Sequence, residues 1–279
     1  MQIKAAEVAK LRAMTGAGMM DCKKALVEAE GDFTRAQEII REKGKLVAAK
    51  RADRETSEGA VVARVNGNKA ILVCLGCETD FVAKNDEFKA LAEAIADAAI
   101  AAFPKDAAGL LAAPMANGET VESAITQQTG KTGEKHSLVA YECIEAPYIA
   151  EYIHKINGKL GAIVGFNKPV SEELGRGVAM QVASMKPVSV SKEDCPAEVV
   201  EAELKVYKEQ MKEDPKMAGK PEQLLHQIAQ GKLGKFFSEN TLEEQGYQMG
   251  DGKTSVKDVI AAEDKEAKIL SFRRISLND

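Results

Sequence analysis

The stretch GAVVARVNGNKAILVCL, residues 59–75, decides the fold because it contains both strands of a β-hairpin. Residues 60–65 are β-prone, and the more apolar run at 71–75 predicts a return strand in the centre of a sheet. Asn66-Gly67 lies between the two runs, and both residues tolerate the positive φ that a tight hairpin turn requires. The sequence therefore predicts an antiparallel sheet built around this hairpin.

The same pattern occurs again at Asn157-Gly158 and the apolar run that follows it. A helical pattern comes next in both copies, at residues 87–102 and 172–185. We interpret the copies as a repeated αβ unit; the alternative is a chance similarity of two apolar hairpins. The first copy has the longer connection between strand and helix, a polar loop at residues 78–86. In the second unit we expect strands at residues 137–144, 149–156 and 161–166.

Short helices are predicted at the N-terminal side of the repeat. Apolar residues at helical spacing indicate three of them, at residues 5–14, 21–30 and 32–44, and Gly44 is expected to end the third. Residues 45–54 are rich in Lys and Arg, which is typical of a solvated helical linker or of a charged contact strip. Residues 104–118 are expected to be an irregular connection, followed by a short helix near residues 121–128.

A helical hairpin is predicted after Pro196. Two amphipathic patterns, at residues 196–212 and 224–236, are separated by a polar turn at 214–221 that contains Pro and Gly. A last helix near 256–263 and a strand near 268–277 follow. The fold class is therefore α+β, with an N-terminal three-helix module, a core of two repeated αβ subdomains with antiparallel sheets, and an inserted antiparallel helical hairpin. We place the units at residues 1–55 (helical module and linker), 56–136 (first αβ subdomain), 137–195 (second αβ subdomain), 196–237 (hairpin) and 238–279 (helix and strand returning to the core).

Composition excludes several classes of function. Net charge is −5 and the pI is about 5.5, which argues against a nucleic-acid partner whose phosphates must be neutralised. No apolar run is long enough to cross a membrane, and no signal peptide is visible. Five cysteines without a dense framework predict reduced thiols and a cytoplasmic protein.

The chain offers no convincing set of catalytic residues. Cys74-x-x-Cys77 resembles a metal or redox motif, but no second ligand pair is spaced to complete a zinc site. His136, His154 and His226 are scattered and have no neighbouring nucleophile in the sequence. We therefore expect a binding protein rather than an enzyme, with no metal site and no cofactor.

The polar loop at residues 78–86 contains the best candidate for a binding site. Asp80-Phe81-Val82 places an acid beside an aromatic residue in the polar loop that only the first repeat carries. Phe81 either folds back onto the sheet or serves as an anchor for a partner's pocket.

Two longer motifs resemble the bacterial elongation factor Ts family. LRAMTGAGMMDCKKAL at residues 11–26 is similar to the N-terminal signature of that family, and TDFVAK at 79–84 is similar to its second signature. Weaker similarity covers residues 183–187, 219–221 and nearly the whole chain. The resemblance implies a ubiquitin-associated-like helical module, two αβ subdomains and a helical hairpin. It also implies guanine-nucleotide exchange on elongation factor Tu, which would be bound in its GDP-bound and nucleotide-free forms.

The resemblance also implies roles for single residues. Arg12, Met19 and Met20 would touch the GTPase domain of elongation factor Tu. Thr79, Asp80, Phe81 and Val82 form the motif in which Asp80 and Phe81 would wedge between two helices of the partner and disturb its magnesium site. His154 would meet another domain of the partner from the core. Where the family often has a pair of arginines, this chain has Val139-Ala140.

Two questions stay open at this level. A non-catalytic scaffold, or a module that binds ubiquitin-like folds, would also explain residues 1–44, although not the loop at Phe81. The helical hairpin is suited either to another protein or to a second copy of the chain, which would give a homodimer or a two-plus-two complex with elongation factor Tu.

Overall fold

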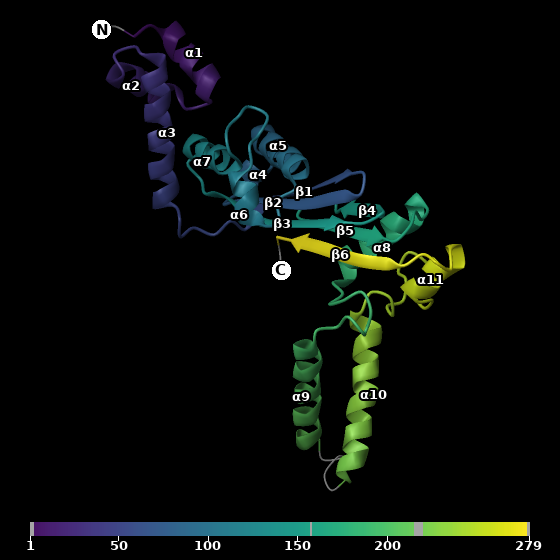
Figure 1. Ribbon diagram of the computed structural model, residues 1–279. Helices are drawn as coiled ribbons and strands as arrows, with labels where there is room; N and C mark the ends of the chain where they lie inside the picture. The colour runs from purple at the N-terminus through teal and green to yellow at the C-terminus, as the bar shows by residue number, and fades with distance from the viewer. Residues whose placement is uncertain (1–2, 157, 215–219, 278–279) are drawn as a thin grey trace.

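The computed structural model describes residues 3–156, 158–214 and 220–277. Its centre is a pair of three-stranded antiparallel sheets, with the N-terminal helices at one end and a long helical hairpin extending away at the other (Figure 1). The first sheet has the order β1(Glu58–Asn66), β2(Lys69–Cys77), β3(His136–Glu145). The second has the order β4(Tyr148–Ile153), β5(Leu160–Phe166), β6(Ile269–Ser276).

The predicted repeat is confirmed as a common topology. Each unit consists of an antiparallel hairpin, a helix after its second strand, and a later strand that pairs with that second strand. The helices are α5(Asp86–Ala102) in the first unit and α8(Glu172–Met185) in the second. The expected turn at Asn66-Gly67 lies one residue later, because Asn66 still pairs with Lys69 and Gly67 alone has a positive φ, of 61°. The turn expected at Asn157-Gly158 falls partly outside the described residues, because Asn157 is not among them.

One strand was assigned to the wrong unit by the sequence. Residues 137–144 were expected in the second unit, but β3 pairs along its length with β2 of the first sheet. The helical segment between β2 and β3 brings the chain back to the free edge of β2, where β3 pairs. Although β3 is followed directly by β4 in the chain, it does not join the sheet of β4.

The two sheets stack on each other, and helices cover their outer faces. Alternate residues of β2 therefore enter different cores, which explains why the strand is apolar from residue 70 to residue 77. Leu72 and Cys74 face the other sheet, where they join Ile163 of β5. Ile71 and Val73 face α5, which contributes Phe88 and Ile95 to the outer core. Burying one such side chain contributes about 1.5–3 kcal/mol. In the second unit, Val164 and Phe166 pack in the same way against Val178 of α8.

The N-terminal helices form a module with its own small core. They are α1(Ala5–Thr15), α2(Met19–Glu28) and α3(Phe33–Lys50), and their buried residues include Leu11 and Leu26. The prediction that Gly44 ends the third helix was wrong, because α3 continues to Lys50 and crosses α7(Val121–Thr132). At this crossing a Cβ on Gly130 would lie 2.8 Å from the Cα of Gly44. Close packing of two glycine backbones thus extends the helix through a residue of low helix propensity.

The segment between α5 and α7 is more regular than the sequence suggested. Residues 104–118 contain a short helix, α6(Ala107–Ala112), which begins where the Asp106 carboxylate accepts a hydrogen bond from the Gly109 amide at 2.7 Å. The helix expected near residues 121–128 continues to Thr132, where Gly133 adopts a positive φ of 74°. This turn leads directly into β3 and brings residues 133–135 beside the end of β2.

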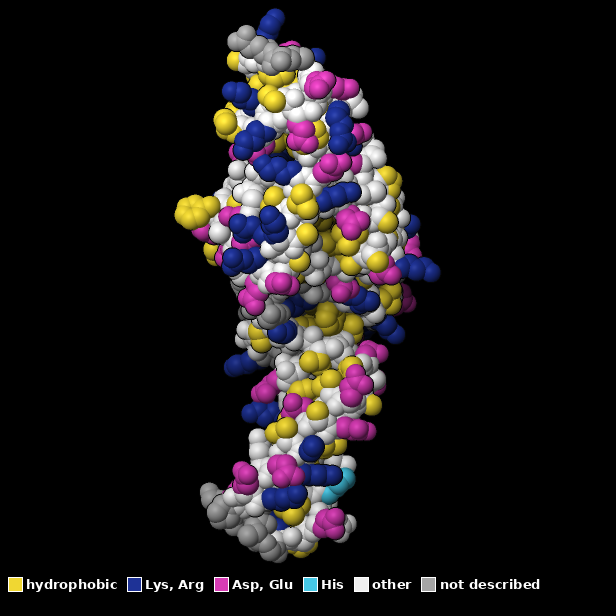
Figure 2. Space-filling view, turned by 90° about the vertical axis from the view of Figure 1, so that its left-hand side faces the viewer, with side chains coloured by type: hydrophobic (Ala, Val, Ile, Leu, Met, Phe, Trp, Pro, Cys, Tyr) yellow, Lys and Arg dark blue, Asp and Glu magenta, His cyan; other side chains and the backbone are white. Residues whose placement is uncertain are grey.

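The helical hairpin is present as predicted. It consists of α9(Ala197–Glu213) and α10(Glu222–Asn240), which lie side by side and project away from the sheets (Figure 1). Most of the expected turn between them, at residues 215–219, lies outside the described residues. Hydrophobic and charged side chains are interspersed along this arm of the molecule (Figure 2). In its described part, the buried residues are Met211, Ala229 and Phe236.

The chain then returns to the second unit through α11(Val256–Glu263) and β6, as the sequence predicted. Within the described residues, none of the helices combines the length and hydropathy that a membrane crossing requires.

Candidate functional site

The residues Thr79–Val82 lie on a short helix instead of the polar loop that the sequence predicted. Helix α4(Asp80–Ala83) follows β2 directly. Its N-cap is Thr79, whose hydroxyl accepts a hydrogen bond from the Val82 amide at 3.4 Å. Val82 and Ala83 pack against the outer core of the first sheet, which fixes one side of the helix.

Phe81 lies on the opposite side and points away from the protein. Its exposed fraction is 84%, so the alternative that Phe81 folds back onto the sheet was wrong. The next residue on the outer side is Asp80, which forms an ion pair with Lys84 at 2.6 Å. The Lys84 hydrogen bond lowers the pKa of Asp80, and the same contact raises the pKa of Lys84. The site therefore presents an apolar ring next to a carboxylate that is ionised at neutral pH.

Two glutamates hold the base of α4. Glu134, in the turn from α7 to β3, accepts hydrogen bonds from the Thr79 amide at 3.2 Å and from the Thr79 hydroxyl at 2.9 Å. Glu78, the residue before Thr79, accepts a hydrogen bond from the Lys135 amide at 2.6 Å. Each carboxylate thus binds the backbone of the segment that carries the other one. Sequence reasoning missed both residues, because their partners are more than fifty residues away in the chain.

The same cluster contacts the end of α3. Arg51 binds both oxygens of Glu78, at 2.9 and 3.0 Å. The Lys135 ammonium donates hydrogen bonds to the carbonyl oxygens of Ala52 and Arg54, at 2.6 and 2.8 Å. The hydrogen bond from the Lys135 amide, assisted by Arg51, lowers the pKa of Glu78. Of the two alternatives for residues 45–54, a solvated linker or a charged contact strip, these contacts favour the second, because the end of the segment is attached to the base of the Phe81 helix.

Arg12, Met19 and Met20 are all exposed on the helical module, with exposed fractions of 45% for Met19 and 64% for Met20. Arg12 and Met19 line a groove between the module and helices α5 and α7, where Leu91 lies on the opposite wall. Met20 does not line this groove. The three residues lie on the helical module and not on α4, so they form a second candidate contact area.

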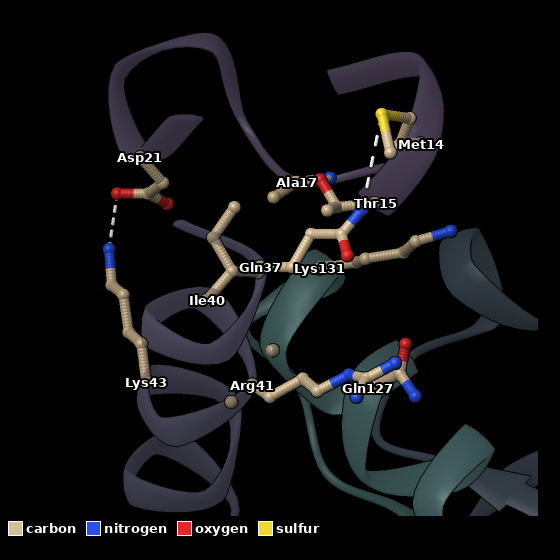
Figure 3. Close-up of a pocket in the computed structure, with 12 residues that line it drawn as sticks. Met14, Thr15, Ala17, Asp21, Gln37, Ile40, Arg41, Lys43, Gln127 and Lys131 are labelled. Atoms are coloured by element: carbon tan, nitrogen blue, oxygen red, sulfur yellow. Dashed lines mark hydrogen bonds and ion pairs between the residues drawn. The ribbon is translucent and has the colours of Figure 1, made fainter. Parts of the chain in front are cut away.

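A smaller pocket lies where the module meets α7 (Figure 3). On one side, Lys43 of α3 forms an ion pair with Asp21 of α2. On the other, the Gln37 amide donates a hydrogen bond to the Met14 sulfur at 3.9 Å. These contacts join the three helices of the module to one another, and Lys131 of α7 closes the pocket from the core.

His154 follows the end of β4 and is half-buried. Its Nδ1 lies 2.9 Å from the Tyr152 hydroxyl, which fixes the ring against the strand. The next residues reach the Phe81 helix: Lys155 and Ile156 share a groove with Asp80 of α4. Ile156 is 88% exposed. The structure therefore brings α4 and the segment after β4 to the walls of one groove, and His154 itself does not line it.

Cys74, Cys77 and His136 are buried in the core and not on a surface where they could bind a ligand. Burial raises the pKa of the Cys74 and Cys77 thiols to about 12, so both are protonated at neutral pH. His136 is buried against the ring of Phe88, and burial lowers its pKa. Across residues 3–156, 158–214 and 220–277, no group of three His, Cys, Asp or Glu side chains is placed to hold a metal ion.

Comparison with known proteins gives a consistent result. A family model described as "Elongation factor TS" matches residues 78–279. The chain is 46% identical over 280 residues to an elongation factor Ts of Christiangramia forsetii, with 99% of each chain covered. It is 44% identical to the elongation factor Ts of Porphyromonas gingivalis, over 98% of this chain and 97% of the relative. A protein of the same name from Cytophaga hutchinsonii is 44% identical, with 99% of each chain covered.

These matches, on an α+β fold with two antiparallel sheets, identify a factor of translation elongation. More narrowly, the chain belongs to the elongation factor Ts family.

Proposed function

We propose that this protein is a guanine-nucleotide exchange factor that binds elongation factor Tu in its GDP-bound state and promotes release of the GDP. Membership of the family supports the choice of partner. The observation that carries the proposal is Phe81, an aromatic side chain that is 84% exposed on a helix fixed to the core. An exposed aromatic residue beside a charge is typical of a contact that is completed by another protein.

The mechanism is thermodynamic linkage, and no covalent bond has to be made. GDP is held by a GTPase partly through Mg²⁺ that bridges its phosphates to the protein. A factor that binds the opened, metal-free state more tightly than the closed state weakens the binding of metal and nucleotide together, and the coupling is reciprocal. In this scheme Phe81 inserts between two helices of the partner, while Asp80 faces the region of the metal.

Burial of one side chain contributes too little free energy to account for a large acceleration of GDP release. Burying Phe81 in the complex would contribute about 1.5–3 kcal/mol. At about 1.4 kcal/mol per power of ten, this gives one to two powers of ten in an equilibrium constant. The remaining energy must come from a wider interface. Arg12, Met19 and Met20 on the module and His154 at the end of β4 are the proposed further contacts.

A release experiment tests the proposal. Elongation factor Tu loaded with a fluorescent GDP is mixed with this protein and excess unlabelled GDP, and loss of fluorescence is followed by stopped flow. Exchange activity predicts a release rate that rises with the concentration of the factor and then saturates. Complex formation on a sizing column without faster release would instead show a scaffold. Light scattering of the complex separates a one-to-one assembly from a two-plus-two assembly.

A further inference from the structure

We propose that Glu134 is a positioning residue for Phe81: its carboxylate holds the first turn of α4 so that the aromatic ring is presented in a fixed direction. This inference rests on the proposed exchange function. Glu134 is not part of the motif that carries Phe81, and it lies in the turn between α7 and β3.

The carboxylate of Glu134 binds both the amide and the hydroxyl of the N-cap residue Thr79, and we call this pair of contacts the clamp. Glu134 Oε2 accepts from the Thr79 amide at 3.2 Å, and the Thr79 hydroxyl lies 2.9 Å from Oε1 and 3.1 Å from Oε2. The single hydroxyl proton of Thr79 is thus donated to Glu134, which leaves the oxygen free to accept from the Val82 amide at 3.4 Å. Donation to a carboxylate polarises the hydroxyl and makes it a better acceptor. The cap of α4 therefore depends on Glu134.

A helix of four residues has little stability of its own, because nucleation of a helical turn is unfavourable. Its orientation is decided by what binds it. The inner side of α4 is held by apolar contacts of Val82 and Ala83, which resist separation from the core but are not directional. The hydrogen bonds of Thr79 to Glu134 are directional contacts at its first turn, and the Cys77 thiol adds one more by donating to the Thr79 carbonyl oxygen at 3.3 Å.

Glu134 is itself held in place. Its own amide donates a hydrogen bond to the Thr132 hydroxyl at 3.1 Å, and its carbonyl oxygen lies 3.0 Å from Nδ1 of His136. The reciprocal contact of Glu78 with the Lys135 amide joins the same two segments a second time. The clamp is therefore rigid before any partner binds, which lowers the entropy that must be lost when Phe81 inserts.

The effect on exchange should appear in the maximal rate. Phe81 is exposed in the free protein, so loosening α4 removes no buried contact of the ring. A loosened α4 leaves the other contact areas intact and still lets the complex form. We expect the maximal rate of GDP release to fall about tenfold in Glu134→Ala, which corresponds to about 1.4 kcal/mol, while the half-saturating concentration changes little.

The experiment compares three variants by two measurements. Glu134→Ala removes the clamp, and Glu134→Gln keeps a carbonyl acceptor and should recover part of the loss. Glu142→Ala is the matched control, since Glu142 lies on β3 and pairs with Arg273 far from α4. Hydrogen exchange of the Val82 amide is measured by NMR in the free protein, and fluorescent GDP release is measured at saturating factor. Should Glu134→Ala fold poorly, Glu134→Gln takes its place, since it keeps the length of the side chain and removes only the charge and one carboxylate acceptor.

The expected result is faster amide exchange at Val82 and slower maximal release in Glu134→Ala, with Glu142→Ala like the wild type. A double variant with Phe81→Ala should lose no more rate than Phe81→Ala alone, because the clamp acts through the ring. Unchanged exchange at Val82, or losses that add in the double variant, would overturn the proposal. The NMR measurement does not involve elongation factor Tu, so it still tests the clamp if wild-type protein fails to accelerate release.

Discussion

Phe81 and Phe88 are the same residue type at opposite extremes of burial, only seven positions apart. Phe81 is 84% exposed and Phe88 is fully buried. Phe81→Ala should therefore change the free energy of unfolding by no more than about 0.5 kcal/mol. Phe88→Ala should cost about 3–5 kcal/mol and lower the melting temperature visibly. Calorimetry of both variants checks this difference.

The maximal rate of GDP release with Phe81→Ala shows whether the ring opens the partner or only adds binding affinity. If the ring acts on the opened state of the partner, the variant should release GDP more slowly even when all partner is bound. If the ring only adds affinity, excess factor should restore the rate. Stopped-flow release titrated to saturation decides, and full recovery of the maximal rate would refute the wedge role.

His136 should make stability depend on pH. Burial against Phe88 lowers its pKa below the ordinary value of 6.5, although contact with the Glu134 carbonyl opposes the shift. The unfolded chain then takes up a proton before the folded protein does. Stability should be constant above neutrality and should fall as the pH drops through about 6.5. Melts between pH 7.5 and 5.5 should show a weaker dependence in His136→Gln, whereas His226→Gln, at an exposed position on α10, should match the wild type.

At the scale of elements, the crossing of α3 and α7 gives a matched pair of glycine substitutions. A methyl group on Gly44 would meet its nearest atoms at 3.5 and 3.8 Å, which are ordinary contacts. Gly44→Ala should therefore gain up to about 1 kcal/mol from helix propensity. A methyl group on Gly130 would lie 2.8 Å from the Cα of Gly44, so Gly130→Ala should push the helices apart. Trypsin cleavage near Arg51 and Arg54 should be faster in Gly130→Ala than in Gly44→Ala. Equal rates would show that the crossing does not hold the module.

The hairpin should be dispensable for the core. Its buried residues Met211 and Ala229 lie on α9 and α10 themselves, and the two helices pack mainly against each other. Replacing residues 199–229 with a short Gly/Ser linker should leave the sheets folded and exchange measurable. Circular dichroism and GDP release are the measurements. Loss of all exchange with an intact core would place the hairpin in the active surface.

Elements with a clear apolar period were predictable from the sequence. Helices α5, α8 and α9 carry that period, the first hairpin carries apolar runs on either side of its turn residues, and the structure confirms these elements. The continuation of α3 beyond Gly44 was not predictable, because it depends on a glycine in α7. The pairing of β3 with β2 was missed for a similar reason, since the return path of the chain decides it. At the site, Phe81 was recognised from its motif, but Glu134 and Glu78 act on segments remote in sequence and no local pattern marks them.

At the scale of the whole molecule, the helical module should contribute affinity more than exchange. It carries Arg12, Met19 and Met20, and it meets the core through α7 and through Arg51 and Lys135. Deleting residues 1–55 should lower the melting temperature, since the Arg51–Glu78 pair and the α3–α7 packing are lost, but one cooperative transition should remain. The half-saturating concentration in GDP release should rise more than the maximal rate falls. Disappearance of the cooperative transition would show that the core requires the module to fold.

The pairing of β5 with β6 has a consequence for how the chain folds during synthesis. Phe166 of β5 pairs with Ile269 of β6, so the second sheet is closed by a contact between residues separated by the whole hairpin. A ribosome adds residues at about 5–20 per second, which leaves β5 with an open edge for several seconds while the intervening chain is made. An unpaired apolar strand edge is a site for aggregation. The third strand of the first unit is made earlier, so the first unit is able to fold first and to cover the inner face of β5. The edge of β5 that pairs with β6 stays open until β6 has been made. Nascent chains arrested just before β6 should therefore be the species that chaperones bind most strongly.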